Sequence, residues 1–211
     1  MIEDYKTVRT AAQDEFTEKR SRFIGYCTPV ATEAEATAFI SRIRSKHWDA
    51  RHNVYAYSLR EGNIKRYSDD GEPSGTAGMP VLDVIVKNGV TNVCVVVTRY
   101  FGGVLLGTGG LVRAYSQAAR LALDAGEVVL MERCALCTLH CTYNQYGKVA
   151  ALVQSLSAGL DDTVYGADVT LQFHIRPDNI SSLEKSLADA TAGEVTVQSD
   201  KEEFFPVSVK S

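Results

Sequence analysis

Two arginines flank a glycine-rich stretch in the middle of the chain, a combination suited to binding an anion. Arg99 directly follows a run of β-branched residues, and Arg113 lies three residues after the last glycine of the stretch. Glycine lets the backbone adopt positive φ and lets a ligand approach closely, and free N–H groups at a helix start attract anions. We expect Arg99 at a strand end and Arg113 in the first turn of the following helix, where together they would hold a phosphate or carboxylate. A purely structural loop is the alternative.

The glycine pattern matches neither of two common nucleotide-binding motifs. No Gly-Lys-Ser/Thr sequence follows the glycines, which excludes a P-loop. Gly107 and Gly109 have the first spacing of the dinucleotide fingerprint, but its third glycine and its later acidic residue are missing.

A stretch of turn-forming residues at 68–78 contains three carboxylates, those of Asp69, Asp70 and Glu72. Carboxylates can bind a divalent cation or act in acid–base chemistry. However, spacing fixes no histidine or nucleophile beside them, and Ser74 does not lie in a nucleophile-elbow pattern. The sequence therefore predicts no catalytic residue, no metal and no cofactor.

Hydrophobic patterning predicts the elements that position these stretches. Residues 93–98 form a strand buried on both faces, and apolar residues at helical spacing from Leu111 onward form a helix that ends near 124–126. A short helix at 79–88 follows the acidic loop. Earlier in the chain, we expect short strands at 15–17 and 23–27 around a basic turn, and a hairpin of strands at 53–59 and 64–67.

A capping box at Thr32 and Glu35 opens a helix whose outer face and exit are basic. Cations interleaved with an aromatic residue are typical of a nucleic-acid surface, since bases stack while charges meet phosphates. Ordinary solvation of a helix explains the charges as well. The possible nucleic-acid face consists of Arg42, Arg44, Lys46, His47, Trp48 and Arg51.

The chain beyond residue 126 follows a regular strand and helix order. We expect strands at 127–141, 160–165, 169–175 and 194–209, and helices at 146–156 and 177–187. The order β-α-β-β-α-β is that of a ferredoxin-like split unit. We therefore predict an α+β protein with one domain at 1–126 and a ferredoxin-like domain at 127–211.

Three of the five cysteines cluster with His140 in the sequence CALCTLHC. A metal site is one interpretation of this cluster. The alternative is an alternating strand with Ala135, Cys137, Leu139, Cys141 and Tyr143 on one face. Zinc usually needs a second pair of ligands, and none follows elsewhere, which favours the strand.

Charge is unevenly distributed along the chain. The formal net charge is −4, composed of +2 in residues 1–126 (16 basic, 14 acidic) and −6 in residues 127–211 (6 basic, 12 acidic). Any nucleic-acid surface is thus expected on the first half. No apolar run is long enough for a membrane helix, and the first residues are unlike a signal peptide, so we expect a cytoplasmic protein.

Two long motifs resemble those of the IMPACT family in its bacterial, two-domain form. They are DDGEPSGTAGMPVL at 69–82 and VVTRYFGGVLLGTGGLVRAY at 96–115. The resemblance implies a first domain with the fold of the second domain of a small-subunit ribosomal protein, and a second domain similar to the last domain of an elongation factor. From the resemblance we expect a binding site at the motif positions Asp69, Asp70, Gly71, Glu72, Pro73, Ser74, Gly75, Thr76, Arg99, Tyr100, Phe101, Gly102, Gly103, Gly107, Gly109, Gly110 and Arg113.

Three hypotheses about function follow. The resemblance implies a regulator of translation that binds RNA or the ribosome. The mixed charge of the motif site favours instead a small-ligand protein or an enzyme with a concave pocket that brings Glu72 near Arg99. The third is a protein-interaction module, as in eukaryotic relatives that act in the amino-acid starvation response.

Overall fold

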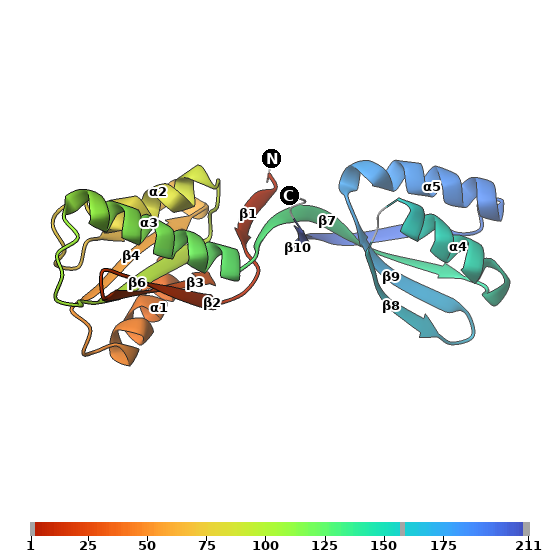
Figure 1. Cartoon of the computed structure of the whole chain (residues 1–211). Helices are drawn as coiled ribbons and strands as arrows, with labels where there is room; N and C mark the ends of the chain where they lie inside the picture. The colour runs from red at the N-terminus through yellow and green to blue at the C-terminus, as the bar shows by residue number, and fades with distance from the viewer. Residues whose placement is uncertain (1–2, 157–158, 209–211) are drawn as a thin grey trace. The chain divides into compact units, whose positions relative to one another are not determined.

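The computed structural model describes residues 3–156 and 159–208 of the 211-residue chain. They form two compact units (Figure 1), one of Tyr5–Leu130 with residues 207–208 and one of Met131–Pro206 with residues 3–4. The division falls inside the long strand β7 (Val128–Cys141), shortly after residue 126. No helix in the described part of the chain is long and apolar enough to cross a membrane.

A five-stranded antiparallel sheet of order β2-β3-β6-β4-β5 forms the centre of the first unit. Its strands are β2 (Ala12–Glu18), β3 (Ser21–Pro29), β4 (His52–Leu59), β5 (Ile64–Ser68) and β6 (Val93–Tyr100). The 3-10 turn η1 (Glu61–Asn63) connects β4 to β5, and β1 (Tyr5–Val8) pairs with β7. The central strand β6 is the β-branched run that the sequence predicts to be a strand.

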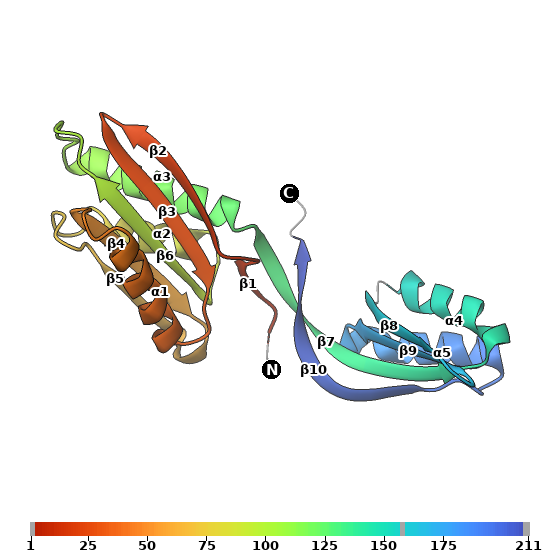
Figure 2. The same ribbon diagram turned by 90° about the horizontal axis from the view of Figure 1, so that it is seen from below.

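Helices cover both faces of this sheet, as Figures 1 and 2 show. They are α1 (Glu33–Lys46) on one face and α2 (Gly78–Lys87) and α3 (Thr108–Ala125) on the other. Val95 and Val97 of β6 belong to the core beneath α2 and α3, whereas Cys94 and Val96 belong to the core beneath α1. Burial of β6 on both faces is therefore confirmed, and successive side chains of this strand face opposite layers.

The capping box at the start of α1 is confirmed in its first half, with Thr32 as the N-cap, but the Glu35 side chain bonds the residue before the N-cap. The Thr32 hydroxyl accepts a hydrogen bond from the Glu35 backbone N–H at 3.2 Å, and the Glu35 carboxylate accepts one from the Ala31 N–H at 2.7 Å. The first bond satisfies an N–H group that the helix start leaves without an intrahelical partner, and the second ties the preceding residue to the first turn.

Strand register gathers several loops at one end of the sheet. Arg22 pairs with Tyr100 across β3 and β6, and His52 pairs with Arg99 across β4 and β6. The starts of β3 and β4 therefore lie beside the end of β6, and Figure 2 shows the adjoining loops at the same end. We call this the loop end of the first unit; it carries residues 19–22, 47–52, 69–77 and 101–107.

The second unit has the predicted β-α-β-β-α-β order. After β7 come α4 (Tyr143–Ser155), β8 (Gly159–Tyr165), β9 (Val169–Ile175), α5 (Pro177–Thr191) and β10 (Val197–Ser208). The strand order is β10-β7-β9-β8, with α4 and α5 contributing to one core with β7 and β9. This is the ferredoxin-like arrangement expected from the sequence.

The cysteine-rich segment lies in β7. Ala135, Cys137, Leu139 and Cys141 are buried on one face, as the alternating pattern predicts, and all five cysteines of the chain are buried free thiols. Tyr143 does not continue this face, because the strand ends at Cys141 and Tyr143 begins α4. In residues 3–156 and 159–208 no group of three or more His, Cys, Asp or Glu side chains is placed to hold a metal ion.

Several predicted strand ends are wrong. The strands predicted at 15–17 and 23–27 extend to the full lengths of β2 and β3, because backbone pairing continues through the polar residues that flank their apolar centres. The last strand begins at Val197 rather than at 194, and residue 209 lies outside the described residues.

Candidate functional site

A buried ion pair connects the two sequence motifs at the loop end. Arg99 Nη1 lies 2.6 Å from Glu72 Oε1, and the two side chains are only 6% and 4% exposed. Arg99 is the penultimate residue of β6, and Glu72 follows β5 in the acidic loop. The approach of Glu72 to Arg99 that the small-ligand hypothesis requires is therefore present.

Further polar groups hold this pair in place. The Tyr115 hydroxyl of α3 donates to Glu72 Oε1 at 2.7 Å, and Arg99 Nη2 donates to the Ser21 hydroxyl at 3.3 Å. Burial and the adjacent Glu72 carboxylate raise the pKa of Tyr115, so this hydroxyl stays protonated and acts as a donor. The Glu72 carboxylate thus accepts hydrogen bonds from strand β6 and from helix α3, which covers the sheet.

Arg99 keeps one donor without an acceptor. Its guanidinium lies 5.4 Å from the ring centres of both Phe23 and Phe101, in cation–π geometry. The Nε–H of this 5% exposed residue is buried and has no hydrogen-bond partner within the described part of the chain. Such groups are rare in folded proteins and call for an explanation.

His52 lies beside the ion pair with a defined tautomer. Its Nδ1 lies 2.9 Å from the Asp70 backbone carbonyl oxygen, which can only accept, so Nδ1 carries the proton. Its Nε2 faces Glu72 Oε1 at 3.9 Å. His52 therefore adds a third side chain to the Glu72 environment.

A cavity of about 410 Å³ opens next to these side chains. Its polar wall consists of Arg51, His52, Glu72 and Arg99. Its apolar wall consists of Pro73, Phe101, Leu105, Leu106 and Leu111, and the chain from Gly107 to Thr108 completes it. An apolar cavity with a few convergent polar groups is the usual form of a small-ligand site.

The start of α3 borders this cavity and differs from the sequence expectation. The helix begins at Thr108, so Gly109 and Gly110 lie in its first turn and Arg113 lies in its second turn. Gly107 precedes the helix with a φ of 72°, and no side chain caps the helix start. The low helix propensity of glycine hid this first turn from sequence analysis.

Arg113 does not join Arg99. Arg113 lines a separate cavity of about 170 Å³ together with Phe16, Lys19 and Gln117, and it does not line the larger one. The expectation that the two arginines hold one anion is therefore wrong, because the extra helical turn moves Arg113 along α3.

The other two carboxylates of the acidic loop have structural partners. Asp69 accepts from the backbone N–H groups of Gly75, Ala77 and Gly78 at 2.8–3.1 Å, and so binds the start of α2. Asp70 accepts from Arg44 Nη2 and from the Asn53 N–H, both at 2.6 Å. The three carboxylates thus point to three different sets of donors rather than to a shared cation.

The remaining loop residues shape the backbone. Thr76 donates to the Pro73 carbonyl at 2.7 Å, Gly71 and Gly75 adopt positive φ, and Ser74 is exposed. Gly102 lies against the β2–β3 turn, where an added Cβ would lie only 2.0 Å from the Arg20 carbonyl oxygen. Gly103 also has positive φ.

Tyr100 and His47 belong to the opposite face of the sheet. Tyr100 donates to Asp49 at 2.9 Å, so it must accept from His47 Nδ1 at 2.8 Å, and the His47 Nε2 then accepts from the Tyr26 hydroxyl at 2.6 Å. Burial, with added repulsion from Lys46 and Arg22, lowers the pKa of His47. His47 is 8% exposed, so its placement on the possible nucleic-acid face is wrong: the chain turns inward as α1 ends.

The other residues of that face divide into two groups. Arg42, Lys46, Trp48 and Arg51 are exposed, and Trp48 is 83% exposed. Arg44 is held by its ion pair with Asp70. The face therefore keeps its aromatic residue and most of its cations at the surface.

The sequence alone does not mark Ser21, Tyr115 or His52 as members of the site. Tyr115 occupies an apolar-stripe position of α3, where only its hydroxyl indicated a buried polar partner. Ser21 follows a basic turn and carried no signal of its own. Only the packing of β3, β4 and α3 around Glu72 brings these side chains together.

Comparison with known proteins agrees with this architecture. The model of the Impact N-terminal domain matches residues 19–123, and that of a domain of unknown function (DUF1949) matches residues 139–194. The "IMPACT family member YvyE" of Bacillus subtilis is 35% identical over 201 residues, covering 94% of this chain and 92% of that protein. The "IMPACT family member YigZ" of Escherichia coli is 36% identical over 182 residues, covering 83% and 87%.

A solved structure has the same organisation. The "Crystal structure of an hypothetical protein" is 32% identical, with a TM-score of 0.60, and the similarity covers 96% of this chain and 100% of that one. Identity above 30% over nearly the whole length, together with the match to the first domain, shows that the chain belongs to the IMPACT family.

Proposed function

We propose that this chain is a translation-associated regulatory protein that binds RNA or the ribosome through the loop end of its first unit. This role goes beyond membership of the IMPACT family, which by itself names no ligand for this chain. The observation that carries it is the gathering of the basic β2–β3 turn, the exit of α1 and the two motif loops at one end of the sheet.

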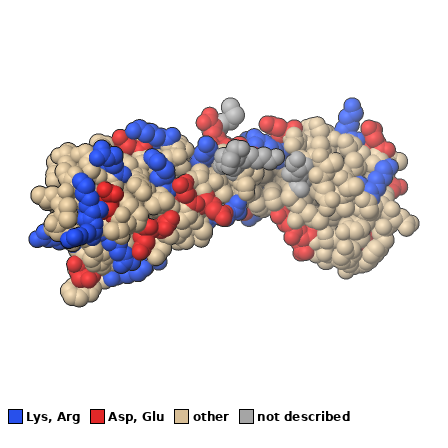
Figure 3. Space-filling model, in the orientation of Figure 1, with Lys and Arg blue, Asp and Glu red and all other residues tan. Residues whose placement is uncertain are grey.

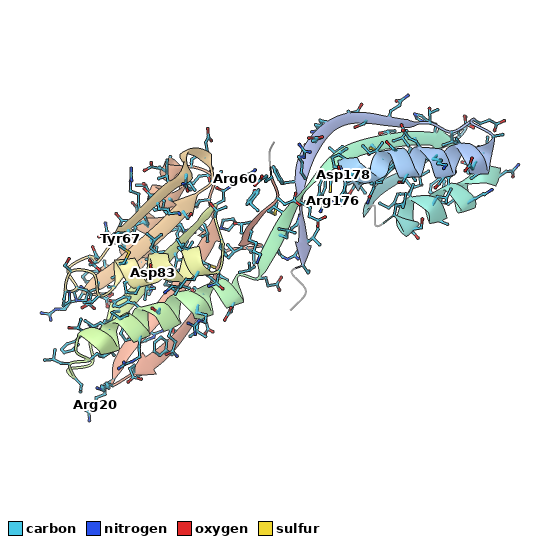
Figure 4. All side chains as sticks on the ribbon, turned by 90° about the horizontal axis from the view of Figure 1, so that it is seen from above. Arg20, Arg60, Tyr67, Asp83, Arg176 and Asp178 are labelled. Carbon is cyan, nitrogen blue, oxygen red and sulfur yellow. The ribbon has the colours of Figure 1, made fainter. Side chains whose placement is uncertain are left out.

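Charge and exposure at the loop end support nucleic-acid contact. Lys19 and Arg20 at the β2–β3 turn and Arg51 after α1 are exposed. Figure 4 shows Arg20 at the loop end, with Arg60 at the opposite end of the same unit. Figure 3 shows Lys and Arg side chains spread over the first unit toward this end, with acidic side chains among them. Exposed Lys and Arg side chains suit contact with phosphates.

Exposed aromatic and apolar side chains complement these charges. Trp48 is 83% exposed and Phe101 is 41% exposed, both in segments of the loop end. Stacking of a base on an exposed aromatic ring contributes about 1–3 kcal/mol. Together with the flanking cations, these rings favour a nucleic-acid surface over ordinary helix solvation.

Binding of the full-length protein to ribosomes and to structured RNA at low and moderate salt tests the proposal. A Lys19→Glu/Arg20→Glu/Arg51→Glu variant should bind far more weakly. Its log–log salt slope should be shallower by about 2–3, from about 0.7–0.9 per lost phosphate contact. A Lys65→Glu/Lys87→Glu variant is the matched control, because both lysines are exposed at the other end of the sheet.

Two outcomes would contradict the proposal. If wild-type protein binds neither ribosomes nor RNA at either salt, a protein partner becomes the better hypothesis for this end of the unit. If both variants bind as wild type does, the RNA contact lies elsewhere on the chain.

A further inference from the structure

We propose that the 410 Å³ cavity binds one nucleotide, with its phosphate at the start of α3 beside Arg51 and its base against Phe101 and Leu105. This inference rests on the proposed function and deepens it by assigning a ligand class to the motif site. A free nucleotide and a nucleotide within a single strand share this chemistry.

The start of α3 supplies the first part of a phosphate site. The helix has 18 residues, and the first N–H groups of a helix have no intrahelical acceptors. Gly107 has no side chain that could cap them, and Thr108 is exposed at the cavity wall. A phosphate oxygen is the acceptor that such a helix start favours.

The unpaired Arg99 donor is the second, independent observation. Arg99 lines the cavity, is 5% exposed, and its Nε–H has no acceptor within the described residues. Its charge is already balanced by Glu72 at 2.6 Å. The Nε–H is itself closed to solvent, so a ligand oxygen would give this donor its missing partner once the Phe101 ring, which packs on the guanidinium and is 41% exposed, shifts aside.

Charge in the cavity favours an anion. Once Arg99 and Glu72 offset each other, Arg51 and the positive end of the α3 dipole remain. No ion pair involves Arg51 among the residues that the structure describes. A single phosphate group matches this balance, and guanidinium groups bind phosphates in a bidentate manner.

A phosphate group alone would not contact the apolar wall of the cavity. Leu105 is 82% exposed and Phe101 is 41% exposed, and both line the cavity with Leu106 and Leu111. Inorganic phosphate would leave this wall in water, and a purely apolar ligand would leave the Arg99 donor unpaired. A nucleotide presents both a phosphate and a flat apolar face, and the volume lies within the usual range for small-ligand sites.

Titration calorimetry on the full-length protein tests the inference with a nucleoside 5′-monophosphate, the matching nucleoside, inorganic phosphate and a short single-stranded oligonucleotide. The monophosphate should bind at least about ten-fold more tightly than the nucleoside or phosphate alone, because only the monophosphate contacts both the polar and the apolar wall of the cavity. Tighter binding of the oligonucleotide, in competition with the monophosphate, would identify a nucleotide within a strand. Tighter binding of the monophosphate would identify a free nucleotide. Either result supports the site.

Thr108→Asp and Ser181→Asp form the decisive pair of variants, because each adds one negative charge and Thr108 lines the cavity whereas Ser181 does not. An acidic residue at the helix start stabilises the helix while repelling an anion. Thr108→Asp should therefore keep or raise the unfolding midpoint but weaken monophosphate binding at least about ten-fold, whereas Ser181→Asp, which adds the same charge at an exposed position of α5 in the second unit, should bind as wild type does. Equal binding by the two variants, or no binding of the monophosphate by wild type, would overturn the inference. If salt-dependent RNA binding survives in that case, the proposed function stands without the nucleotide site.

Discussion

The Tyr115 hydroxyl of α3 and the Arg99 guanidinium of β6 bind the same oxygen of Glu72, at 2.7 Å and 2.6 Å. This shared acceptor connects the acidic loop, the central strand and the helix that follows the glycine-rich loop. Burial strengthens the coupling, since the charges of Arg99 and Glu72 are screened little by water. The geometry of the loop end depends on this contact.

Removing one member of the buried ion pair should destabilise the protein more than removing both. Arg99→Met or Glu72→Leu alone leaves a buried charge without its partner, at a cost of about 3–5 kcal/mol. The double variant should be more stable than either single variant, and so lose clearly less than the sum of the two single losses. Urea unfolding of the four proteins measures this, and strictly additive losses would show that the pair is not coupled.

Tyr115→Phe should lower the free energy of unfolding by about 1–3 kcal/mol, because it removes a buried donor to a carboxylate. The ring itself stays in the core, so no cavity is created. Tyr67→Phe is a suitable control, since Tyr67 is 43% exposed. Equal stability of Tyr115→Phe and wild type in urea would mean that Glu72 does not need this hydroxyl.

His47 should make stability depend on pH on the acidic side of neutrality. Its pKa is lowered in the native state by burial and by Lys46 and Arg22, so the unfolded chain binds the proton at higher pH. Its contribution is fully present above the unfolded value of about 6.5 and is lost as pH falls through the lowered native pKa. Thermal midpoints between pH 8 and 5 should fall more steeply for wild type than for His47→Gln; parallel curves would contradict this.

Two glycine substitutions should have opposite effects on stability. Gly102→Ala places a Cβ 2.0 Å from the Arg20 carbonyl oxygen, so the β2–β3 turn must move and the unfolding midpoint should fall. Gly147→Ala lies inside α4 with open space around the new Cβ, and should add about 0.5–1 kcal/mol. A harmless Gly102→Ala substitution would show that the turn adapts without loss.

The sequence predicts strands in both units well where their periodic patterns are local. The β-branched run of β6 and the alternation in β7 both identify their strands, since side-chain period depends only on neighbouring residues. The site is harder to predict. Arg99 contacts Glu72 and lies apart from Arg113, because strand register and the first turn of α3 set the positions of these residues. Local sequence patterns predict neither the register nor the start of this helix.

His47 is a second residue whose position local sequence patterns do not predict. It follows a basic helix and precedes an exposed tryptophan, so sequence alone places it on a charged surface. The structure buries it against Tyr26 and Tyr100, because the chain turns inward where α1 ends. A polar residue beside charged neighbours can thus be part of the interior when tertiary contacts satisfy both ring nitrogens.

Mapping the RNA contact on the full-length protein by NMR chemical-shift perturbation tests the central claim most directly. Addition of a short structured RNA at low salt should shift backbone amides in residues 19–22, 47–52 and 101–108, and the shifts should reverse as salt is raised. Amides of Lys65 and Lys87, at the other end of the sheet, should stay unchanged. Perturbations confined to the second unit or to the far end of the first would contradict RNA binding at the loop end.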